Sequence, residues 1–513
     1  MASEEVLERE RVVEDRLDKV RSLRERGIEP FGYAYDPTHT AVEARTLFER
    51  WESSERPGGA DGPTERVRLA GRVVAKRVMG KSTFVHLADR TGRIQLYFRV
   101  NDLHEGYELL DMVDLSDWIG AEGAVFRTRT GEVSLRVTSF ELLSKAVRPL
   151  PLGKEETDPE TGERRVYSGF SDVEARYRQR YADLAVNPEV REVFVTRARI
   201  VSALRRFLDE RGFVEVETPV LQPVYGGALA RPFTTHHNAL DMQLYLRIAD
   251  ELYLKRLIVG GMERVYEISK DFRNEGLSRF HNPEFTMLEF YAAYMDYGAV
   301  MDLTEEMLGY VARETVGDGK VRFGGHEIDF TPPFRRYTMY EALRELGGVD
   351  VENASLDELR EQVRALGTDE DPASMGRGRL IDELFGERVE PKLIQPTFIT
   401  DYPREMSPLA KPKRGNPELT ERFELIVAGK ELCNAYSELN DPIDQRERFE
   451  AQHRLKLAGD EETQPLDEDF LRAMEYGMPP TGGFGMGVDR LTMILTDQPS
   501  IRDVILFPTM RPE

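Results

Sequence analysis

Residues 263–291, ERVYEISKDFRNEGLSRFHNPEFTMLEFY, predict two antiparallel strands joined by a long polar loop. Because side chains of a strand alternate between its two faces, each strand can be divided into two sets. The first strand has a charged face of Glu267, Asp271, Arg273 and Glu275, opposite Tyr266, Ile268 and Phe272. The return strand groups Phe285, Met287, Glu289 and Tyr291. If these two faces line one floor, that floor carries an arginine, several carboxylates and an aromatic ring.

Such a floor suits a ligand that carries both phosphate and cationic groups. Arg273 can hold a phosphate oxygen or a carboxylate through two parallel hydrogen bonds. Phe285 can stack on a flat base, and Glu289 with Tyr291 can receive an ammonium group. The alternative is an ordinary sheet with one solvated, charged face, which is the more common structure for a charged hairpin taken alone.

The pattern FRNEG followed by HNPEFT resembles motif 2 of the class II aminoacyl-tRNA synthetases, in the subgroup for aspartate, asparagine and lysine. Residues 205–221, a helix and strand that end in a proline, resemble motif 1, which builds the dimer interface in that family. Residues 480–496 resemble motif 3. The pair Gly485 and Gly487 could instead suggest a dinucleotide loop, but Arg490 stands where the third glycine would be, and no βαβ unit frames the segment.

Length and composition predict a cytoplasmic protein with two or three domains. The chain has 513 residues, more than one core accommodates. The first residues are charged, without the apolar stretch of a signal peptide, and no apolar run has the length of a membrane span. Cys433 is the only cysteine, which excludes disulfides within the chain and zinc sites built from cysteines.

Charge is distributed unevenly along the chain. The net charge of -23 argues, taken alone, against a nucleic-acid partner, since binding to phosphates draws on lysine and arginine. Residues 66–99, however, contain nine basic residues and one acidic residue, Asp89. One basic block therefore lies in an otherwise acidic protein.

The expected fold class is α+β, with an OB-fold β-barrel followed by the antiparallel sheet and flanking helices of a class II catalytic domain. Residues 1–63 have the spacing of charged surface helices. Short alternating strands predict the barrel over 64–147. A charged connector, whose first half has the composition of disordered segments, covers 148–186. The catalytic domain takes 187–513, including an acidic, helical insertion at about 300–390.

The predicted barrel carries a candidate surface for single-stranded nucleic acid. Since Val85 and Leu87 must face the core, Phe84 is expected outside, within the basic block. Exposed rings beside cations can stack bases. An isolated exposed phenylalanine more often has no such role, but this segment resembles the anticodon-binding domain of the same subgroup. The resemblance implies that Phe84 stacks the central uridine of the anticodon of tRNA(Lys), with Arg77, Gln95 and Glu132 around it.

The resemblance also assigns the other site residues. It implies Arg273 and Arg490 as catalytic residues. For lysine it implies Gly227, Glu251, Arg273, Glu289, Tyr291, Asn434, Tyr436 and Glu438, although Glu251 could equally be a helix-surface charge. For ATP it implies Arg273, Glu275, His281, Phe285, Glu431 and Arg490. Glu424 and Glu431 would hold Mg²⁺ shared with the triphosphate; considered alone, their segment predicts only an exposed acidic hairpin.

Lysine is favoured by charge as well as by resemblance. Two carboxylates and a phenol suit an ε-ammonium, and desolvating that group without such partners is costly. The implied reaction is adenylation of L-lysine by ATP and transfer to tRNA(Lys), which needs positioning and charge neutralisation rather than a protein nucleophile. The alternatives are an aspartyl- or asparaginyl-tRNA synthetase, an enzyme that attaches lysine to a protein, and a non-catalytic tRNA-binding scaffold. A homodimer through motif 1 and no membrane association are expected.

Overall fold

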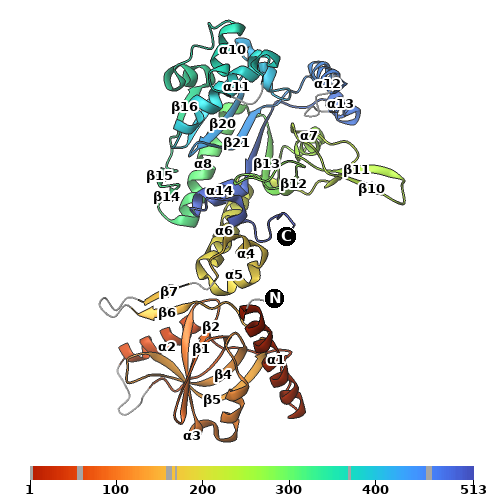
Figure 1. Cartoon of the computed structure of the whole chain (residues 1–513). Coiled ribbons are helices and arrows are strands. Elements are labelled where there is room, and N and C mark those ends of the chain that lie inside the picture. Colours follow the sequence, from red (N-terminus) through yellow and green to blue (C-terminus); the bar gives the residue numbers. More distant parts are fainter. Residues whose placement is uncertain are drawn as a thin grey trace. The chain divides into compact units, whose positions relative to one another are not determined.

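The computed structural model describes residues 4–54, 62–157, 164–167, 170–367, 371–457 and 465–512 (Figure 1). It divides into two compact units, each described here by itself. The first comprises Met1–Arg176 and Tyr181–Asn187, and the second comprises Tyr177–Arg180 and Pro188–Glu513. Among the described residues, no helix combines the length and apolar character needed to cross a bilayer.

The first unit contains a closed five-stranded barrel. Its strands are β1 (Arg66–Met79), β2 (Ser82–Ala88), β3 (Arg93–Arg99), β4 (Trp118–Arg127) and β5 (Val133–Ser144), in the order β1-β2-β3-β5-β4. Alternate residues, among them Val67, Val85 and Leu96, are fully buried in the interior. The expectation of a small barrel from alternating short strands is confirmed.

Helices surround this barrel. The predicted N-terminal helices are α1 (Glu4–Glu25) and α2 (Ala41–Ser53), and α2 begins with a capping box between Thr40 and Glu43. Between β3 and β4 the chain forms α3 (Val100–Leu103) and a 3₁₀ helix, η1 (His104–Met112). Leu23 and Phe48 join the barrel core, which explains why these two helices have an apolar stripe among dense charge.

The connector is more regular than its composition indicated. Strands β6 (Lys154–Thr157) and β7 (Arg164–Tyr167) pair as an antiparallel hairpin, so the disorder expected for this half is wrong for the eight described residues. Backbone pairing of adjacent segments does not need apolar side chains, which is why composition missed it. Residues 158–163 and 168–169 lie outside the described residues. Helices α4 (Val173–Arg178) and α5 (Arg180–Val186) follow.

An eight-stranded sheet organises the second unit. Its order is β16 (Arg335–Thr338), β17 (Thr397–Thr400), β20 (Arg422–Val427), β21 (Lys430–Ser437), β22 (Thr481–Gly487), β13 (Glu284–Ala293), β12 (Arg264–Phe272) and β8 (Val214–Glu215). Neighbours are antiparallel except for the two edge pairs, β16–β17 and β12–β8. The predicted antiparallel sheet is confirmed, and the predicted hairpin 263–291 forms its neighbouring strands β12 and β13, between β22 and the edge strand β8.

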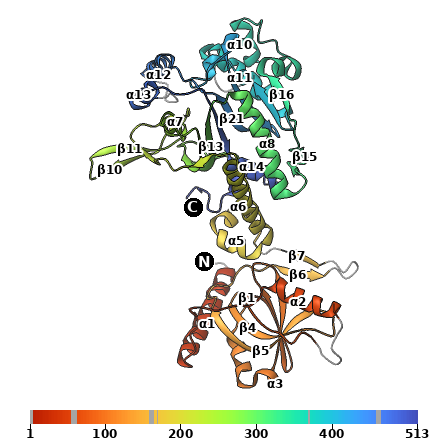
Figure 2. The ribbon, with the colours of Figure 1, turned by 180° about the vertical axis from the view of Figure 1, so that it is seen from behind.

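One face of the sheet is covered by α6 (Pro188–Asp209), α8 (Tyr297–Val316) and α14 (Val488–Leu495), which run beside the strands in Figure 2. Phe290 of β13 and Phe484 of β22 stack with ring centroids 4.6 Å apart in this core. Apolar side chains of all three helices join them. The opposite face is left for polar side chains, with α7 (Glu251–Val259) beside it.

Two expectations for this unit need correction. The strand expected to continue to Pro219 is only two residues long. Beyond it, Thr218 N and Oγ1 donate to the Glu267 carboxylate at 3.1 and 2.7 Å instead of joining the ladder. The segment at about 300–390 is not wholly helical, and its first helix, α8, belongs to the main core, because its buried residues pack on the sheet.

The remaining elements of the second unit are short, and most belong to the insertion or to loops at the edge of the sheet. They are β9 (Leu221–Gln222), β10 (Thr234–His237), β11 (Met242–Leu246), β14 (Lys320–Phe323), β15 (His326–Asp329), α9 (Met339–Ala342), η2 (Leu343–Gly347), α10 (Leu356–Arg364), η3 (Pro372–Ser374), α11 (Arg377–Arg388), η4 (Glu390–Lys392), η5 (Arg404–Met406), β18 (Pro412–Lys413), β19 (Asn416–Thr420), α12 (Pro442–Leu457), α13 (Glu468–Glu475) and α15 (Ile501–Val504).

Candidate active site

The register of β12 and β13 brings the two predicted faces together. Glu267 pairs with Glu289, and Asp271 pairs with Phe285, so their side chains lie on one face of the sheet. Tyr266, Leu288 and Phe290 point into the core on the other face. The charged face is buried, with Asp271 0% and Glu289 5% exposed. The alternative of a solvated charged face is therefore wrong.

A buried arginine balances part of this charge. Arg247 Nη1 lies 3.0 Å from Asp250 Oδ1 and 2.7 Å from Glu267 Oε1, and Arg247 Nε lies 3.4 Å from Asp271 Oδ1. Burial raises the pKa of Asp271 to about 6, although Arg247 and Arg273 lower it. Burial and the neighbouring Asp271 raise the pKa of Asp250 well above its usual value. Around Arg247 this part of the floor has three carboxyl groups for one cation, so it favours positive ligands.

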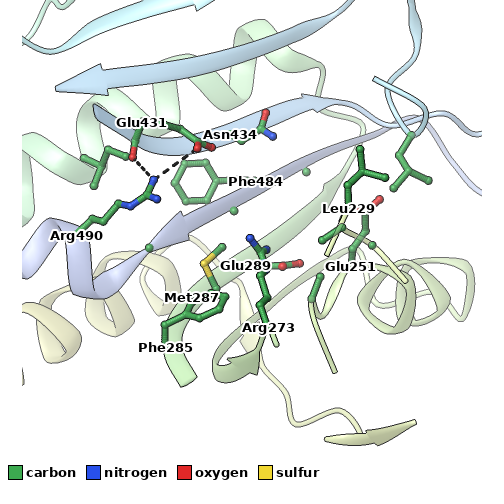
Figure 3. A pocket seen from close by; sticks show the side chains of 18 of the residues that line it. Leu229, Glu251, Arg273, Phe285, Met287, Glu289, Glu431, Asn434, Phe484 and Arg490 are labelled. Carbon is green, nitrogen blue, oxygen red and sulfur yellow. Dashed lines mark hydrogen bonds and ion pairs between the residues drawn. The ribbon is translucent and has the colours of Figure 1, made fainter. Parts of the chain in front are cut away.

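A cavity of about 470 Å³ lies above the floor. Its lining combines residues from β13, β21, β22, the start of α7, and the loop at 406–410. It includes all the residues predicted to bind lysine or ATP, namely Gly227, Glu251, Arg273, Glu275, His281, Phe285, Glu289, Tyr291, Glu431, Asn434, Tyr436, Glu438 and Arg490. Figure 3 shows Glu251, Glu289 and Leu229 toward one end of the cavity and Glu431 and Arg490 toward the other.

The first end is acidic and enclosed. Tyr291 Oη donates to Glu289 Oε2 at 3.2 Å, and Asp250 N donates to Glu289 Oε1 at 3.4 Å. Glu438 is 1% exposed, and its Oε1 has no hydrogen-bond partner among the described residues. Burial raises the pKa of Glu438 to about 8. A buried carboxylate oxygen without a donor is costly, so this end is suited to a cationic donor.

Two glycines make room for these carboxylates. A Cβ on Gly483 would lie 1.8 Å from Glu438 Oε1 and 2.6 Å from Tyr291 Cε1, closer than any side chain could tolerate. Gly227 has φ +88, and a Cβ there would lie 2.9 Å from Glu251 Cβ. Both positions therefore need glycine, one for space and the other for space and backbone conformation.

Glu251 faces the same end of the cavity from α7. Its Oε2 accepts from Tyr436 Oη at 2.9 Å, and its Oε1 lies 2.5 Å from Lys255 Nζ. Lys255 Nζ also pairs with Glu438 Oε2. Glu251 is 3% exposed, so it is not the helix-surface charge that its position in the sequence also allowed.

The other end of the cavity has the groups expected for a nucleotide. The guanidinium of Arg273 lies 5.1 Å from the centre of the Phe285 ring. Arg490 Nη1 donates to the backbone oxygen of Glu431 at 2.6 Å, and Arg490 Nη2 lies 3.4 Å from His281 Nε2. Burial, followed by the charge of Arg490, lowers the pKa of His281. Since arginine can only donate, His281 Nε2 is the acceptor in this contact, and Nδ1 lies 2.8 Å from Ser278 Oγ.

The two predicted metal ligands have different surroundings. Glu431 lines the cavity and Glu424 does not. Glu424 is paired with Arg422, whose Nη2 lies 2.5 Å from its Oε1. Burial raises the pKa of Glu424 to about 7, and the charges of Glu431 and Asp382 raise it as well. Excess negative charge therefore surrounds this pair.

The predicted anticodon residues gather on one side of the barrel. Arg77 pairs with Phe84 across β1 and β2, and the Phe84 ring stacks on Tyr97 at 4.9 Å. Gln95 Nε2 donates to Glu132 Oε2 at 2.6 Å. Gln95 is only 9% exposed, and its Oε1 accepts from Ser134 Oγ at 3.1 Å.

Several residues of this site were not found in the sequence. Lys255 follows Glu251 by four positions, a spacing typical of exposed helix pairs, and nothing in the sequence indicates that this pair is buried. Arg422 and Asp382 approach Glu424 only through the fold. The loop at 406–410 has no recognisable pattern and lines the cavity only because it lies beside β21.

Comparisons with known proteins agree with this arrangement. Residues 172–511 match the family model described as tRNA synthetases class II (D, K and N), and residues 67–143 match an OB-fold nucleic acid binding domain. The chain is 54% identical to a lysine--tRNA ligase of Moorella thermoacetica over 97% of both chains. It is 52% identical to that of Pelotomaculum thermopropionicum over 97% of this chain and 94% of the relative. It is 51% identical to that of Carboxydothermus hydrogenoformans over 98% of both.

Proposed function

Because the chain belongs to the class II tRNA synthetases of the aspartate, lysine and asparagine group, and its relatives with 51–54% identity are lysine--tRNA ligases, we propose that it attaches L-lysine to tRNA(Lys) with ATP. The observation that carries this proposal is the enclosed end of the cavity. There Glu289 and Glu438 are buried, and Glu438 Oε1 has no donor among the described residues. An ε-ammonium supplies that donor and the positive charge.

Each part of the substrate lysine has a counterpart in the cavity. The ε-ammonium would lie between Glu289 and Glu438, with Tyr291 beside it. The α-ammonium would lie by Glu251 and the backbone at Gly227. The carboxylate would lie toward Arg273 and Asn434, so that its oxygen points to the nucleotide end. Tyr436 would hold Glu251 in place through the hydrogen bond that it donates.

ATP would occupy the other end. Adenine would stack on Phe285, with Glu275 at its amino group, and Arg490 and His281 would contact the outer phosphates. Arg273 lies between the two ends and would bridge the lysine carboxylate and the α-phosphate. Its guanidinium is held against the Phe285 ring, so it needs little reorganisation to do so.

Two transfers follow from this arrangement. A lysine carboxylate oxygen attacks the α-phosphorus, the bond to the bridging oxygen of pyrophosphate breaks, and lysyl-adenylate remains. A hydroxyl of the terminal tRNA ribose then attacks the acyl carbon, and AMP leaves. Neither transfer uses a nucleophile of the protein, so Arg273 and Arg490 act by neutralising charge and by positioning the reactants.

Mg²⁺ fits the acidic group beside the nucleotide end. The donors are hard carboxylate oxygens, which Mg²⁺ prefers. Burial is the main cause of the raised pKa of Glu424, and a bound cation would favour its charged form. We propose Glu431 as a ligand at the cavity wall, with Glu424 behind it. When bound, the ion would neutralise the triphosphate and the leaving pyrophosphate. Glu424 must first exchange its contact with Arg422.

The barrel would bind the anticodon loop. Phe84, extended by the Tyr97 ring, offers a stacking platform, and Arg77 beside it offers a cation for the backbone. Gln95 and Glu132, which already bond to each other, would read the base edge. The basic block of residues 66–99 supplies the electrostatic attraction that an acidic protein otherwise lacks.

We also propose a homodimer through residues 205–221 and a cytoplasmic location. Within this segment Val214, Val220 and Leu221 are 50%, 38% and 48% exposed, which leaves an apolar surface for a second copy. The cytoplasm is the compartment of tRNA charging, and a chain with one cysteine suits a reducing environment.

The aspartate and asparagine alternatives lack support at the pocket. A substrate carboxylate would meet Glu251, Glu289 and Glu438, which repel it, and the cation there, Lys255, is already paired with two of them. A scaffold without catalysis would not need the intact cavity. Lysine attachment to a protein would not need the basic barrel.

Lysylation of tRNA tests the proposal directly. Purified protein with ATP, Mg²⁺ and radiolabelled lysine should transfer label to tRNA(Lys) and not to tRNA(Asp) or tRNA(Asn). Label in protein instead of tRNA would favour the protein-modifying alternative, and no label in either would favour the scaffold.

A further inference from the structure

Lys255 is a buried cation at the acidic end of the cavity. Its side chain is 0% exposed, and its Nζ lies 2.5 Å from Glu251 Oε1 and pairs with Glu438 Oε2. The rings of Tyr291 and Tyr436 lie 5.9 and 5.7 Å from the same nitrogen. Among the described residues, Lys255 is the one basic side chain within ion-pair distance of either carboxylate.

The two oxygens of Glu438 therefore differ. Oε2 is in ion-pair contact with Lys255 Nζ, whereas Oε1 lies next to Gly483 of the cavity wall and has no ion-pair contact in the described structure. Neither oxygen accepts a hydrogen bond of ordinary geometry from the described residues. A carboxylate that is free to rotate about its own axis would present either oxygen to the cavity. The contact with Lys255 fixes the plane of the carboxylate and leaves Oε1 without an ion-pair contact among the described residues.

We propose that Lys255 is a positioning residue for lysine recognition: it holds Glu438 through Oε2 at the acidic end of the cavity, and it supplies the positive charge that favours the carboxylate form of Glu438 beside Glu251. This inference rests on the proposed function. Lys255 does not itself touch the substrate in this account. It acts through Glu438 and Glu251, which do.

The charges around Glu438 explain why a cation is needed there. Glu438 is faced by Lys255 and Glu251 from α7 and by Tyr291 from β13, and Glu289 of β13 lines the same cavity. Tyr436 lies two residues before Glu438, in β21. Burial raises the pKa of Glu438 to about 8; Lys255 lowers this pKa and the charge of Glu251 raises it. Without Lys255, two buried carboxylates would remain close together, and one would take up a proton. A protonated Glu438 cannot pair with an ε-ammonium.

The same contact explains why Lys255 can remain charged in the interior. Burial lowers the pKa of Lys255, but Glu251 and Glu438 outweigh burial and raise it. Glu251 is also held by Tyr436 Oη at 2.9 Å. Lys255, the two carboxylates and Tyr436 thus form one connected group, in which each member limits the rotation of the next.

The test compares Lys255→Met, Lys255→Gln and Lys255→Arg by lysine-dependent pyrophosphate exchange across pH. In the two neutral variants KM for lysine should rise about 10- to 100-fold, as expected for loss of a charge-assisted hydrogen bond. KM for ATP should not change. The acid limb of kcat/KM for lysine should move up by about one to three pH units, because the cation that lowers the Glu438 pKa is gone. In Lys255→Arg the acid limb of this pH profile should stay at its wild-type position, because a cation is retained.

Arg256→Met is the matched control. It removes a cation from the next position of α7, but Arg256 Nη2 pairs with Asp467 at 2.8 Å, away from the cavity. This variant should keep the wild-type KM and pH profile. A neutral variant of Lys255 with an unchanged KM for lysine and an unchanged acid limb would overturn the proposal. Equal increases in KM for lysine and ATP would also overturn it, since they indicate general damage.

If the neutral variants of Lys255 do not fold, Glu251→Gln provides a second test, because this substitution leaves Lys255 in the protein. Removal of the Glu251 charge should lower the Glu438 pKa, so the acid limb should move to lower pH while KM for lysine rises. A limb that stayed in place would contradict the coupling. If the wild-type protein showed no lysine-dependent exchange, the proposed function would fail; if it exchanged lysine and the Lys255 variants matched it, only the present inference would fail.

Discussion

At the scale of single residues, the proposed recognition of lysine would depend on carboxylates that are buried. Glu289 and Glu438 have raised pKa values, chiefly because burial disfavours their charged forms. A bound ammonium restores the charged form and removes this penalty, whereas a substrate carboxylate would add to it. Selectivity for a cationic side chain therefore follows from the burial of these groups as much as from their number.

Glu438→Gln should separate lysine binding from ATP binding. The amide keeps the size of the side chain but removes the charge that faces the ε-ammonium. Loss of one partner of a buried charged pair costs about 2–5 kcal/mol. We therefore expect kcat/KM for lysine in pyrophosphate exchange to fall roughly 30- to several thousand-fold, with KM for ATP unchanged. Glu475→Gln, at an exposed position of α13, is the control and should behave as wild type; an unaffected Glu438→Gln would contradict the pocket assignment.

Gly483→Ala should prevent the use of lysine by steric hindrance, without any change of charge. A Cβ there would lie 1.8 Å from Glu438 Oε1, so the carboxylate must leave its position or β22 must shift. KM for lysine should rise at least as much as in Glu438→Gln. Gly386→Ala in α11 is the control. A Cβ on Gly386 would lie 3.9 Å from its nearest neighbour, Glu390 Oε2, so this substitution should leave exchange unchanged. Normal lysine kinetics in Gly483→Ala would mean that Glu438 does not adopt this orientation.

The sequence predicted much of this site, and the reason is local periodicity. Alternation along residues 263–291 correctly placed Phe285, Met287 and Glu289 on one face, because strand geometry alone determines which side chains share a face. Burial is not local, however. Glu251 and Lys255 have the spacing of a surface pair, and only the packing of α7 beside β13 and β21 encloses them.

At the scale of elements, the cavity depends on how three segments are joined behind it. Asp489, at the start of α14, is 2% exposed, and its Oδ2 accepts from Thr286 N of β13 at 2.7 Å. Arg197 of α6 lies 2.6 Å from the other oxygen of Asp489 and donates to Thr286 Oγ1 at 3.0 Å. Since Thr286 follows Phe285 and Asp489 precedes Arg490, this network sets the spacing of the two residues proposed to hold ATP.

Asp489→Asn should therefore weaken ATP binding and stability together. It leaves Arg197 without its anionic partner, and breaking a buried pair costs about 3–5 kcal/mol. We expect a lower midpoint in thermal unfolding and a larger increase in KM for ATP than in KM for lysine. The surface pair of Asp357 and Arg360, 3.3 Å apart, offers the control, because Asp357→Asn should cost about 1 kcal/mol or less. Equal effects of the two substitutions would refute the network.

The ends of helices and strands were predicted less well than the side chains that share one face of a strand, and each error has a physical reason. The strand before Pro219 is shortened because Thr218 bonds to the Glu267 side chain, an interaction that no sequence window reveals. The hairpin of β6 and β7 was missed because its residues are charged and backbone pairing holds it. Helix α8 was assigned to an insertion, although its apolar residues pack on the central sheet.

At the scale of the whole molecule, the chain divides chemistry and tRNA selection between two units. The cavity belongs to the second unit, and the aromatic and basic surface belongs to the barrel of the first. In the proposed function, adenylation would need only the cavity, whereas tRNA charging would need both. The net charge of the whole chain argued against binding of nucleic acid. The basic block between residues 66 and 99 argued for it, because this block coincides with a segment that folds as a barrel.

Phe84→Ala should affect only the second of these reactions. Loss of one base stack costs about 1–3 kcal/mol, so KM for tRNA(Lys) should rise roughly 5- to 150-fold with lysine-dependent exchange unchanged. Tyr33→Ala removes an aromatic side chain that is 98% exposed in the same unit and should have no effect. If both variants reduced tRNA charging equally, the Phe84 surface would have no special role.

The central claim is that the enclosed carboxylates select lysine, and pyrophosphate exchange tests it most directly. Purified protein with ATP and Mg²⁺ is assayed with each of the twenty amino acids separately. We predict exchange with lysine alone, because only its ε-ammonium pairs with Glu289 and Glu438 at the correct distance from Arg273. Exchange with aspartate or asparagine in place of lysine would contradict the account of the pocket while leaving the fold intact.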